Sequence, residues 1–208
     1  MRRHPLLPVA AAASLAAAAC AHSNTPQGGD KVGTSSVTSP ATQATEAWPL
    51  RFRTHSFSAY AFDTYGAHVE YAGVVQLDQD DTVLQPSSSS RGAGYRERWD
   101  GTHIGIDNFP GAAKLRWRSK DGAAHQANID IPSLFADQTI LHRVPREEVS
   151  PQPAQNGQHT SPAILIEIND RTVHVYMRAM IHTLHPQVAG NPRSRFRFDL
   201  VPVKTLVF

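Results

Sequence analysis

Alternation of apolar and polar residues constrains the fold of this chain more than any other feature. In the segment Thr172–Ile181, Val173, Val175, Met177 and Ala179 fall on one side, and the residues between them fall on the other. A period of two residues is typical of a β-strand with one buried face. No stretch of a dozen residues shows the 3.6-residue period of an amphipathic helix. The pattern therefore predicts a mainly β protein.

Two hairpins are predicted from strands that flank turn-forming residues. The apolar run Ala163–Ile168 is followed by Asn169-Asp170 and then by the alternating segment from Thr172 to Ile181. A second alternating segment around Leu115 and Trp117 leads into Lys120-Asp121-Gly122, after which alternation resumes up to Ile131. Asx and Gly residues between strand-like segments favour antiparallel hairpins.

The remaining elements complete an expected antiparallel β-sandwich-like single domain with long loops and little helix. Four further segments have strand character: Leu50–Phe57, Ala67–Leu77, Thr139–Val144 and Phe196–Phe208. The segment Pro132–Ala136 could form one short helical turn. Three long polar loops are expected at Asp78–Gly94, Pro145–Pro162 and His185–Arg195, and loops of this length are often functional, although tolerated surface insertions are the alternative.

The N-terminus has the features of a bacterial lipoprotein signal. Arg2 and Arg3 precede a short apolar run, which ends in three alanines and Cys20, the only cysteine in the chain. This order predicts a lipoprotein signal peptide in residues 1–19, with Cys20 acylated as the mature N-terminus. Ala21, next to the cysteine, favours the outer membrane as the destination. The alternative is an ordinary signal peptide cleaved near Ala19 or Ala21.

Composition divides the rest of the chain into two parts. Residues 20–47 are rich in Ser, Thr, Pro, Gln, Gly and Ala, which predicts a lipidated cysteine followed by a disordered tether that spans roughly 30 Å. Residues 48–208 are long enough for one β-rich binding domain. The chain has 20 Lys and Arg against 18 Asp and Glu, and two of the arginines belong to the signal. The mature chain is therefore neutral, and its charge does not favour a nucleic-acid partner.

Catalytic and metal-binding motifs are absent from the sequence. The chain has no Gly-x-Ser-x-Gly elbow, no His-Glu-x-x-His and no glycine-rich phosphate loop. His182 and His185 are three apart, so on a strand their rings would point to opposite faces. Asp80 with Asp81, and Glu147 with Glu148, lie in polar loop sequence. We therefore expect no catalytic residue, no cofactor and no metal.

The segment Tyr95–Asp100 concentrates residue types that dominate protein interfaces. Arg96, Arg98 and Trp99 are the candidate partner-binding residues, since Arg, Trp and Tyr are enriched at interface hot spots. The alternative is a strand in which Trp99 belongs to the core and the arginines are solvated.

Several strings resemble a family of short proteobacterial lipoproteins encoded beside type VI secretion phospholipase effectors. They are Arg98-Trp99, Gly105–Gly111, Trp117–Gly122 and Asn169–Ala179, within a stretch from about Phe52 to Leu200. The resemblance implies an immunity protein that binds and silences a toxic lipase in the periplasm, and it implies no catalytic residues. A structural or accessory lipoprotein of an envelope machine and a hydrolase with an unrecognised motif are the alternatives.

Overall fold

The computed structural model describes residues 48–151 and 161–208. The signal peptide, Cys20 and the tether, predicted for residues 1–47, lie outside the described residues, as does most of the loop before Pro162. In the described part, no helix is long and apolar enough to cross a membrane.

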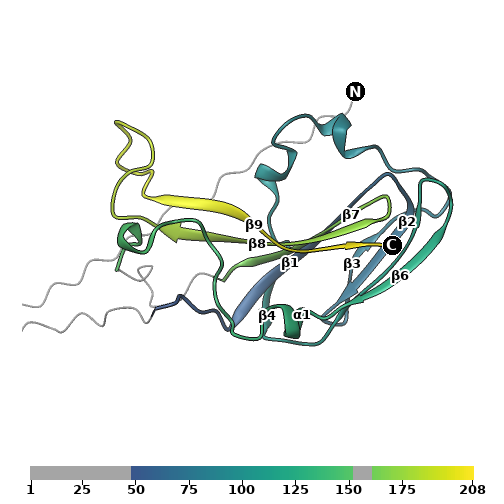
Figure 1. Cartoon of the computed structure of the whole chain (residues 1–208), viewed down its shortest axis with the longest axis horizontal. Helices are drawn as coiled ribbons and strands as arrows, with labels where there is room; N and C mark the ends of the chain where they lie inside the picture. The colour runs from purple at the N-terminus through teal and green to yellow at the C-terminus, as the bar shows by residue number, and fades with distance from the viewer. Residues whose placement is uncertain (1–47, 152–160) are drawn as a thin grey trace, which may run out of the picture. The chain divides into compact units, whose positions relative to one another are not determined.

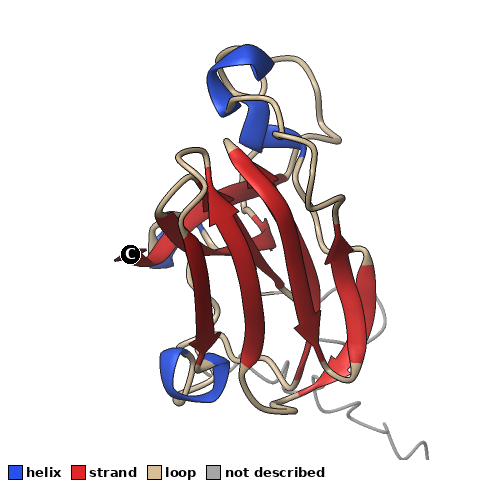
Figure 2. Ribbon diagram, turned by 90° about the vertical axis from the view of Figure 1, so that its right-hand side faces the viewer, coloured by secondary structure: helices blue, strands red, loops and turns tan. Residues whose placement is uncertain are grey.

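The described residues form nine strands in two sheets, which confirms a mainly β fold with little helix (Figure 1). The five-stranded sheet has the order β4-β1-β7-β8-β9, and the four-stranded sheet has the order β3-β2-β5-β6. The short helices lie at the periphery of the strands (Figure 2). The strands are β1 (Thr54–Phe62), β2 (Thr64–Tyr71), β3 (Val74–Asp78), β4 (His103–Asp107), β5 (Ala113–Ser119), β6 (Ala124–Ile129), β7 (Ala163–Asn169), β8 (Thr172–His182) and β9 (Phe196–Val207).

Both predicted hairpins are confirmed. β7 and β8 pair antiparallel from Ala163↔Arg178 to Asn169↔Thr172, and Asp170 in the turn has a positive φ of 54°. β5 and β6 pair antiparallel across the turn that contains Gly122, whose φ is 86°. Asp and Gly tolerate this left-handed conformation, which is why these turns form here. The predicted C-terminal strand is also present, as β9.

The pairing of β1 with β7 was not expected from the sequence, because it is parallel. The other strand pairs of the described chain are antiparallel, so the five-stranded sheet is mixed. β7 is buried at each of its positions from Ala163 to Ile168. Strands buried on both faces have continuous apolar sequences instead of alternating ones. The continuous apolar run Ala163–Ile168 is therefore explained by its position in the middle of the sheet, where both faces are covered.

Three of the strand predictions require correction. Ala67–Leu77 is not one strand, since β2 and β3 form a hairpin whose turn residues Ala72 and Gly73 both have positive φ. Leu50–Phe57 overlaps only the beginning of β1, which continues to Phe62. Thr139–Val144 is not a strand and contributes only an isolated bridge to Arg51. The apolar pattern of this segment is explained by burial of Ile140 and Val144 in the core, although the segment pairs with no strand.

The short helices follow the expected turn chemistry. Helix α1 (Ile131–Leu134) overlaps Pro132–Ala136, the segment expected to form a helical turn, but begins one residue earlier. The Asp130 side chain accepts a hydrogen bond from the backbone N–H of Ser133, as N-cap residues do. The three 3-10 helices are η1 (Ser88–Arg91), η2 (Tyr95–Arg98) and η3 (Arg146–Glu148).

Two apolar clusters stabilise the fold. The main core lies between the sheets, and its largest fully buried side chains include Phe52, Phe57, Tyr71, Phe135 and Met177. A second cluster lies on the opposite side of the five-stranded sheet and comprises Phe62, Trp99, Ala163, Leu165 and Tyr176. The side of this sheet that carries the second cluster is called the outer face below.

Candidate partner-binding surface

Helix η2 covers part of the outer face, where Tyr95 packs against the second cluster. The segment Tyr95–Asp100 is therefore neither a free loop nor a strand: Tyr95–Arg98 is a 3-10 helix, and Trp99 follows it in extended conformation. The strand alternative fails for the backbone but is right about Trp99, which is buried with 6% of its surface exposed.

Trp99 is the centre of an aromatic cluster. Its indole stacks on Tyr60 with a centroid distance of 4.2 Å and an interplanar angle of 5°. Tyr95 and Tyr176 contact it edge-on at 5.4 and 6.3 Å. Aromatic pairs at these distances add to the burial of apolar area. The ring therefore holds the segment against β1 and β8, and it is not free to contact a partner.

A buried carboxylate fixes the same segment by polar contacts. Glu167, in the middle of β7, is fully buried. Its oxygens accept hydrogen bonds from the Tyr95 hydroxyl at 2.6 Å and from the Tyr176 hydroxyl at 3.2 Å. Arg96 donates from Nε at 2.8 Å, and its Nη2 lies 2.7 Å from the same carboxylate oxygen. Four donors thus replace the water that a carboxylate loses on burial.

The tyrosines of this cluster remain protonated donors. Burial, followed by the hydrogen bond to Glu167, raises the pKa of Tyr95 to about 12. Burial also raises the pKa of Tyr176. Both hydroxyls are therefore neutral at physiological pH, and the negative charge of Glu167 is balanced by Arg96.

A second arginine binds the segment from the side of the sheet. Nη1 of Arg178, in β8, donates hydrogen bonds to the backbone carbonyls of Glu97 and Trp99 at 2.5 and 2.6 Å. These carbonyls belong to the end of η2, where helical carbonyls lack partners within the helix. Arg96 thus reaches from the segment to the sheet, and Arg178 reaches from the sheet to the segment.

Beside the anchored segment, the outer face exposes arginine and aromatic side chains. Arg91 and Arg98 are exposed and line a hollow of about 380 Å³ together with Tyr60 and Tyr95. Phe198 is 45% exposed, and the Arg178 guanidinium lies 5.3 Å from its ring centroid. The aromatic–arginine surface, as it is called below, consists of the following exposed or half-exposed residues: Arg91, Arg98, Arg178, Phe196 and Phe198.

The three candidate residues therefore have different roles in the structure. Arg98 points outward and remains a candidate contact residue, whereas Arg96 and Trp99 hold η2 in place.

Phe196 and Phe198 were not identified from the sequence as candidate contact residues. Their alternation with Arg197 and Asp199 could have indicated them, because in a strand this pattern places both rings on one face. Their pairing partners in β8, His182 and Met180, confirm the shared face.

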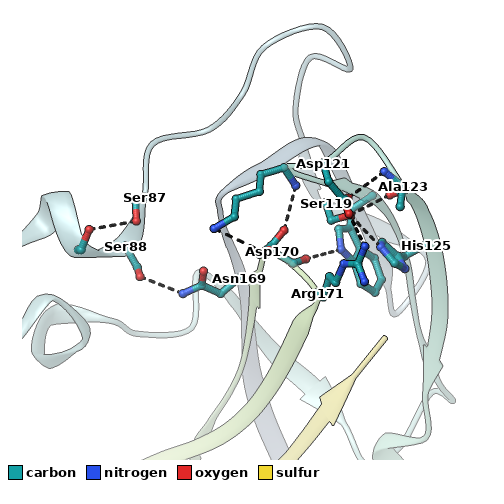
Figure 3. Close-up of polar contacts among 12 residues, drawn as sticks. Ser87, Ser88, Ser119, Asp121, Ala123, His125, Asn169, Asp170 and Arg171 are labelled. Atoms are coloured by element: carbon teal, nitrogen blue, oxygen red, sulfur yellow. Dashed lines mark hydrogen bonds and ion pairs between the residues drawn. The ribbon is translucent and has the colours of Figure 1, made fainter.

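The β5–β6 turn lies against the β7–β8 turn, and Ser119, Asp121 and His125 lie close together there (Figure 3). Trp117 Nε1 donates to the backbone carbonyl of Asp170 at 2.8 Å, and Arg171 forms an ion pair with Asp121. These contacts join the strings Trp117–Gly122 and Asn169–Ala179. These two segments therefore contribute to the scaffold.

Ser119 does not have the environment of a catalytic nucleophile. Its hydroxyl donates to the Asp121 carboxylate, and His125 Nε2 lies 3.0 Å from the same Oγ. The serine is thus the middle member, whereas a nucleophilic triad requires the imidazole between serine and carboxylate. Ser119 is also fully buried. Hydrogen bonds from Ser119 and Ala123, together with Arg171, lower the pKa of Asp121. The ionised carboxylate therefore links the β5–β6 turn to Arg171 of the β7–β8 turn.

A larger hollow, of about 680 Å³, lies on the solvent side of the four-stranded sheet. Its charged side chains are mostly engaged with one another: Glu70 lies 3.5 Å from Lys114, and His68 contacts both Asp78 and Asp81. Among residues 48–151 and 161–208, no group of three or more His, Cys, Asp or Glu side chains could hold a metal ion.

Comparison with protein-family models gave no match, and searches for similar curated proteins and similar solved structures gave none either.

Proposed function

We propose that this chain is a non-catalytic binding protein, and that its aromatic–arginine surface contacts the partner. The observation that carries the proposal is the combination of exposed Phe196 and Phe198 with Arg98 on a segment that Glu167 and Arg178 hold rigidly. Exposed aromatic side chains beside arginines are typical of the contact residues that dominate protein interfaces.

Rigidity of the surface supports a high affinity. Ordering a mobile loop on binding costs about 0.5–1.5 kcal/mol for each immobilised side chain. The contacts of Arg96 and Arg178 order η2 before any partner arrives. A standard interface buries about 800 Å² per partner, an area that one face of a sheet with its covering segment can supply.

We further propose that the partner is a secreted type VI phospholipase effector, which the protein neutralises as an immunity protein. This part of the proposal rests on the resemblance to lipoproteins encoded beside such effectors. It includes acylation at Cys20 and a periplasmic position, anchored to the outer membrane by the lipid. Such a position would place the binding domain in the compartment where the effector attacks phospholipid.

Co-expression tests the proposal. The proposal expects a phospholipase effector to be encoded beside this gene. That effector is exported to the periplasm with and without the protein, and growth is followed. The proposal predicts lysis without the protein and growth with it. Equal killing in both cultures would contradict immunity and would favour an accessory role in an envelope machine.

A matched pair of variants tests the surface. Arg98→Ala combined with Phe198→Ser should abolish protection, because both side chains lie on the aromatic–arginine surface. Arg116→Ala combined with Val75→Ser changes similar exposed side chains on the four-stranded sheet and should preserve protection. Full protection by both folded variants would leave immunity standing and show that the contact surface lies elsewhere.

A further inference from the structure

The loop between β8 and β9 carries positive charge without any acidic residue. Residues 183–196, called the hairpin tip below, contain Arg193 and Arg195 and no Asp or Glu. Neither guanidinium has a hydrogen bond or an ion pair to another described residue. The acidic helix η3 contacts the base of the tip, where the Glu148 carbonyl accepts from the Leu184 N–H. Both arginines are therefore available to an anionic partner.

Large apolar side chains accompany this charge. Leu184 and Val188 are 41% and 56% exposed, and Phe196 at the end of the tip is 41% exposed. Single exposed apolar residues are ordinary, but three in one short loop beside Arg193 and Arg195 form an amphipathic surface.

The tip holds these side chains in a defined arrangement. Ser194 Oγ accepts from the Val188 N–H at 2.9 Å, and the Ser194 carbonyl accepts from the Gln187 N–H at 2.8 Å. At the base, the Thr183 hydroxyl donates to the His185 carbonyl at 2.8 Å. The loop is therefore closed by its own hydrogen bonds and needs no partner to become ordered.

The shape of the tip favours a fluid partner over a rigid one. It projects beyond the ends of β8 and β9 (Figure 1). Neither of the two hollows described above is lined by a residue of the tip. A convex loop with apolar side chains flanked by arginines can enter the boundary between headgroups and acyl chains without a matching pocket.

We propose that the hairpin tip binds the surface of an anionic phospholipid bilayer. Arg193 and Arg195 contact lipid phosphates, and Leu184, Val188 and Phe196 enter the interfacial layer. The interaction does not rest on the proposed function, because it needs no effector and the tip shares only Phe196 with the aromatic–arginine surface.

A fluorophore at the apex tests the proposal. In the exported full chain with Cys20→Ser, which cannot carry its own acyl chain, Val188→Cys supplies one thiol for an environment-sensitive dye. Vesicles containing phosphatidylglycerol should shift its emission to the blue, and pure phosphatidylcholine vesicles should not. The control dye is attached through Ala124→Cys, which is exposed near the turns at the opposite end of the sandwich.

A second variant tests the arginines. Arg193→Gln with Arg195→Gln should weaken vesicle binding roughly thirtyfold, because each basic side chain near an anionic surface contributes about 1 kcal/mol. No shift at position 188, an equal shift with phosphatidylcholine, or equal binding by the arginine variant would each overturn the proposal. So would burial of the dye by the effector protein in the absence of vesicles, since the tip would then belong to the protein interface.

Discussion

The guanidinium of Arg96 lies 2.8 Å, through Nε, from a carboxylate oxygen of Glu167, which is fully buried in β7. This contact joins a 3-10 helix to the centre of a sheet 71 residues away in sequence. If η2 detached, it would leave an unpaired buried charge, which is expensive. A surface segment is thereby tied to the rigid part of the protein.

Removal of Arg96 should destabilise the whole domain. Arg96→Met leaves Glu167 with only tyrosine donors, and we expect the free energy of unfolding to fall by about 3 kcal/mol. Urea denaturation measures it. Arg98→Met, at the exposed neighbouring position, should change it by less than about 0.5 kcal/mol. The double variant Arg96→Met with Glu167→Leu should recover much of the loss, because no charge is left buried.

The β7–β8 hairpin should not tolerate a charge on its inner face. Val175 is fully buried opposite Ile166, so Val175→Asp should lower the free energy of unfolding by several kcal/mol. The matched control is Val75→Asp, because Val75 is a strand residue that is 64% exposed. Similar denaturation midpoints for the two variants would mean that the hairpin does not pack in the core as described.

Stability should decrease below neutral pH because of a buried histidine. His55 Nδ1 donates to the Asn108 side-chain oxygen at 2.8 Å, and its Nε2 accepts from the Tyr71 hydroxyl at 2.9 Å. Burial lowers the pKa of His55, and the hydrogen bond to Asn108 opposes this only in part. Burial also lowers the pKa of His142. The folded state therefore favours neutral imidazoles.

The sign of the pH dependence follows from linkage. Below pH 6.5 the unfolded chain binds protons that the folded chain excludes, so unfolding becomes more favourable as pH falls from 6.5 toward the lowered pKa of His55. Above pH 6.5 the stabilising contribution of the neutral His55 is fully present. Urea midpoints measured at neutral and mildly acidic pH should show a slope that His55→Gln reduces and that His185→Gln, in the exposed hairpin tip, leaves in place.

Lipid attachment predicts a simple fractionation result. Cys20→Ser should release the domain from membranes that are washed at high salt, which screens the proposed contact of the hairpin tip. Its circular dichroism spectrum should remain typical of β-structure, because the domain's core lies between residues 50 and 181. Cells that express each form are fractionated, and the protein is detected in the membrane and soluble fractions. Unchanged membrane attachment of the serine variant, with processing at another site, would contradict acylation at Cys20.

Sequence periodicity predicts the β-fold because local alternation reports directly on burial. Val173, Val175 and Met177 define the inner face of β8, and turn residues such as Gly122 mark where strands end. The same reasoning fails where pairing partners decide the element. Ala72 occupies a left-handed turn that its side chain does not favour, so Ala67–Leu77 resembles one strand. The parallel pairing of β1 with β7 depends on contacts far apart in sequence.

The candidate site could be predicted only in part, because residue type alone does not distinguish an interface from a core. Trp99 and Arg98 are neighbours with the same statistical association with interfaces, but the indole packs on Tyr60 and the guanidinium is exposed. For Arg96 the distinguishing feature is Glu167, a single charge within the otherwise apolar run Ala163–Ile168. A buried charge in such a run requires a cation from elsewhere, and this signal could have identified Arg96 as structural.

Titration calorimetry of the purified protein with its proposed partner, a type VI phospholipase effector expected to be encoded beside its gene, tests the central claim most directly. The account predicts a tight one-to-one complex, with a Kd that rises at least thirtyfold, or about 2 kcal/mol, when Arg98→Ala and Phe198→Ser are combined. The control variant Arg116→Ala with Val75→Ser should bind like the original protein. The absence of any binding between the folded protein and the folded effector would contradict the account.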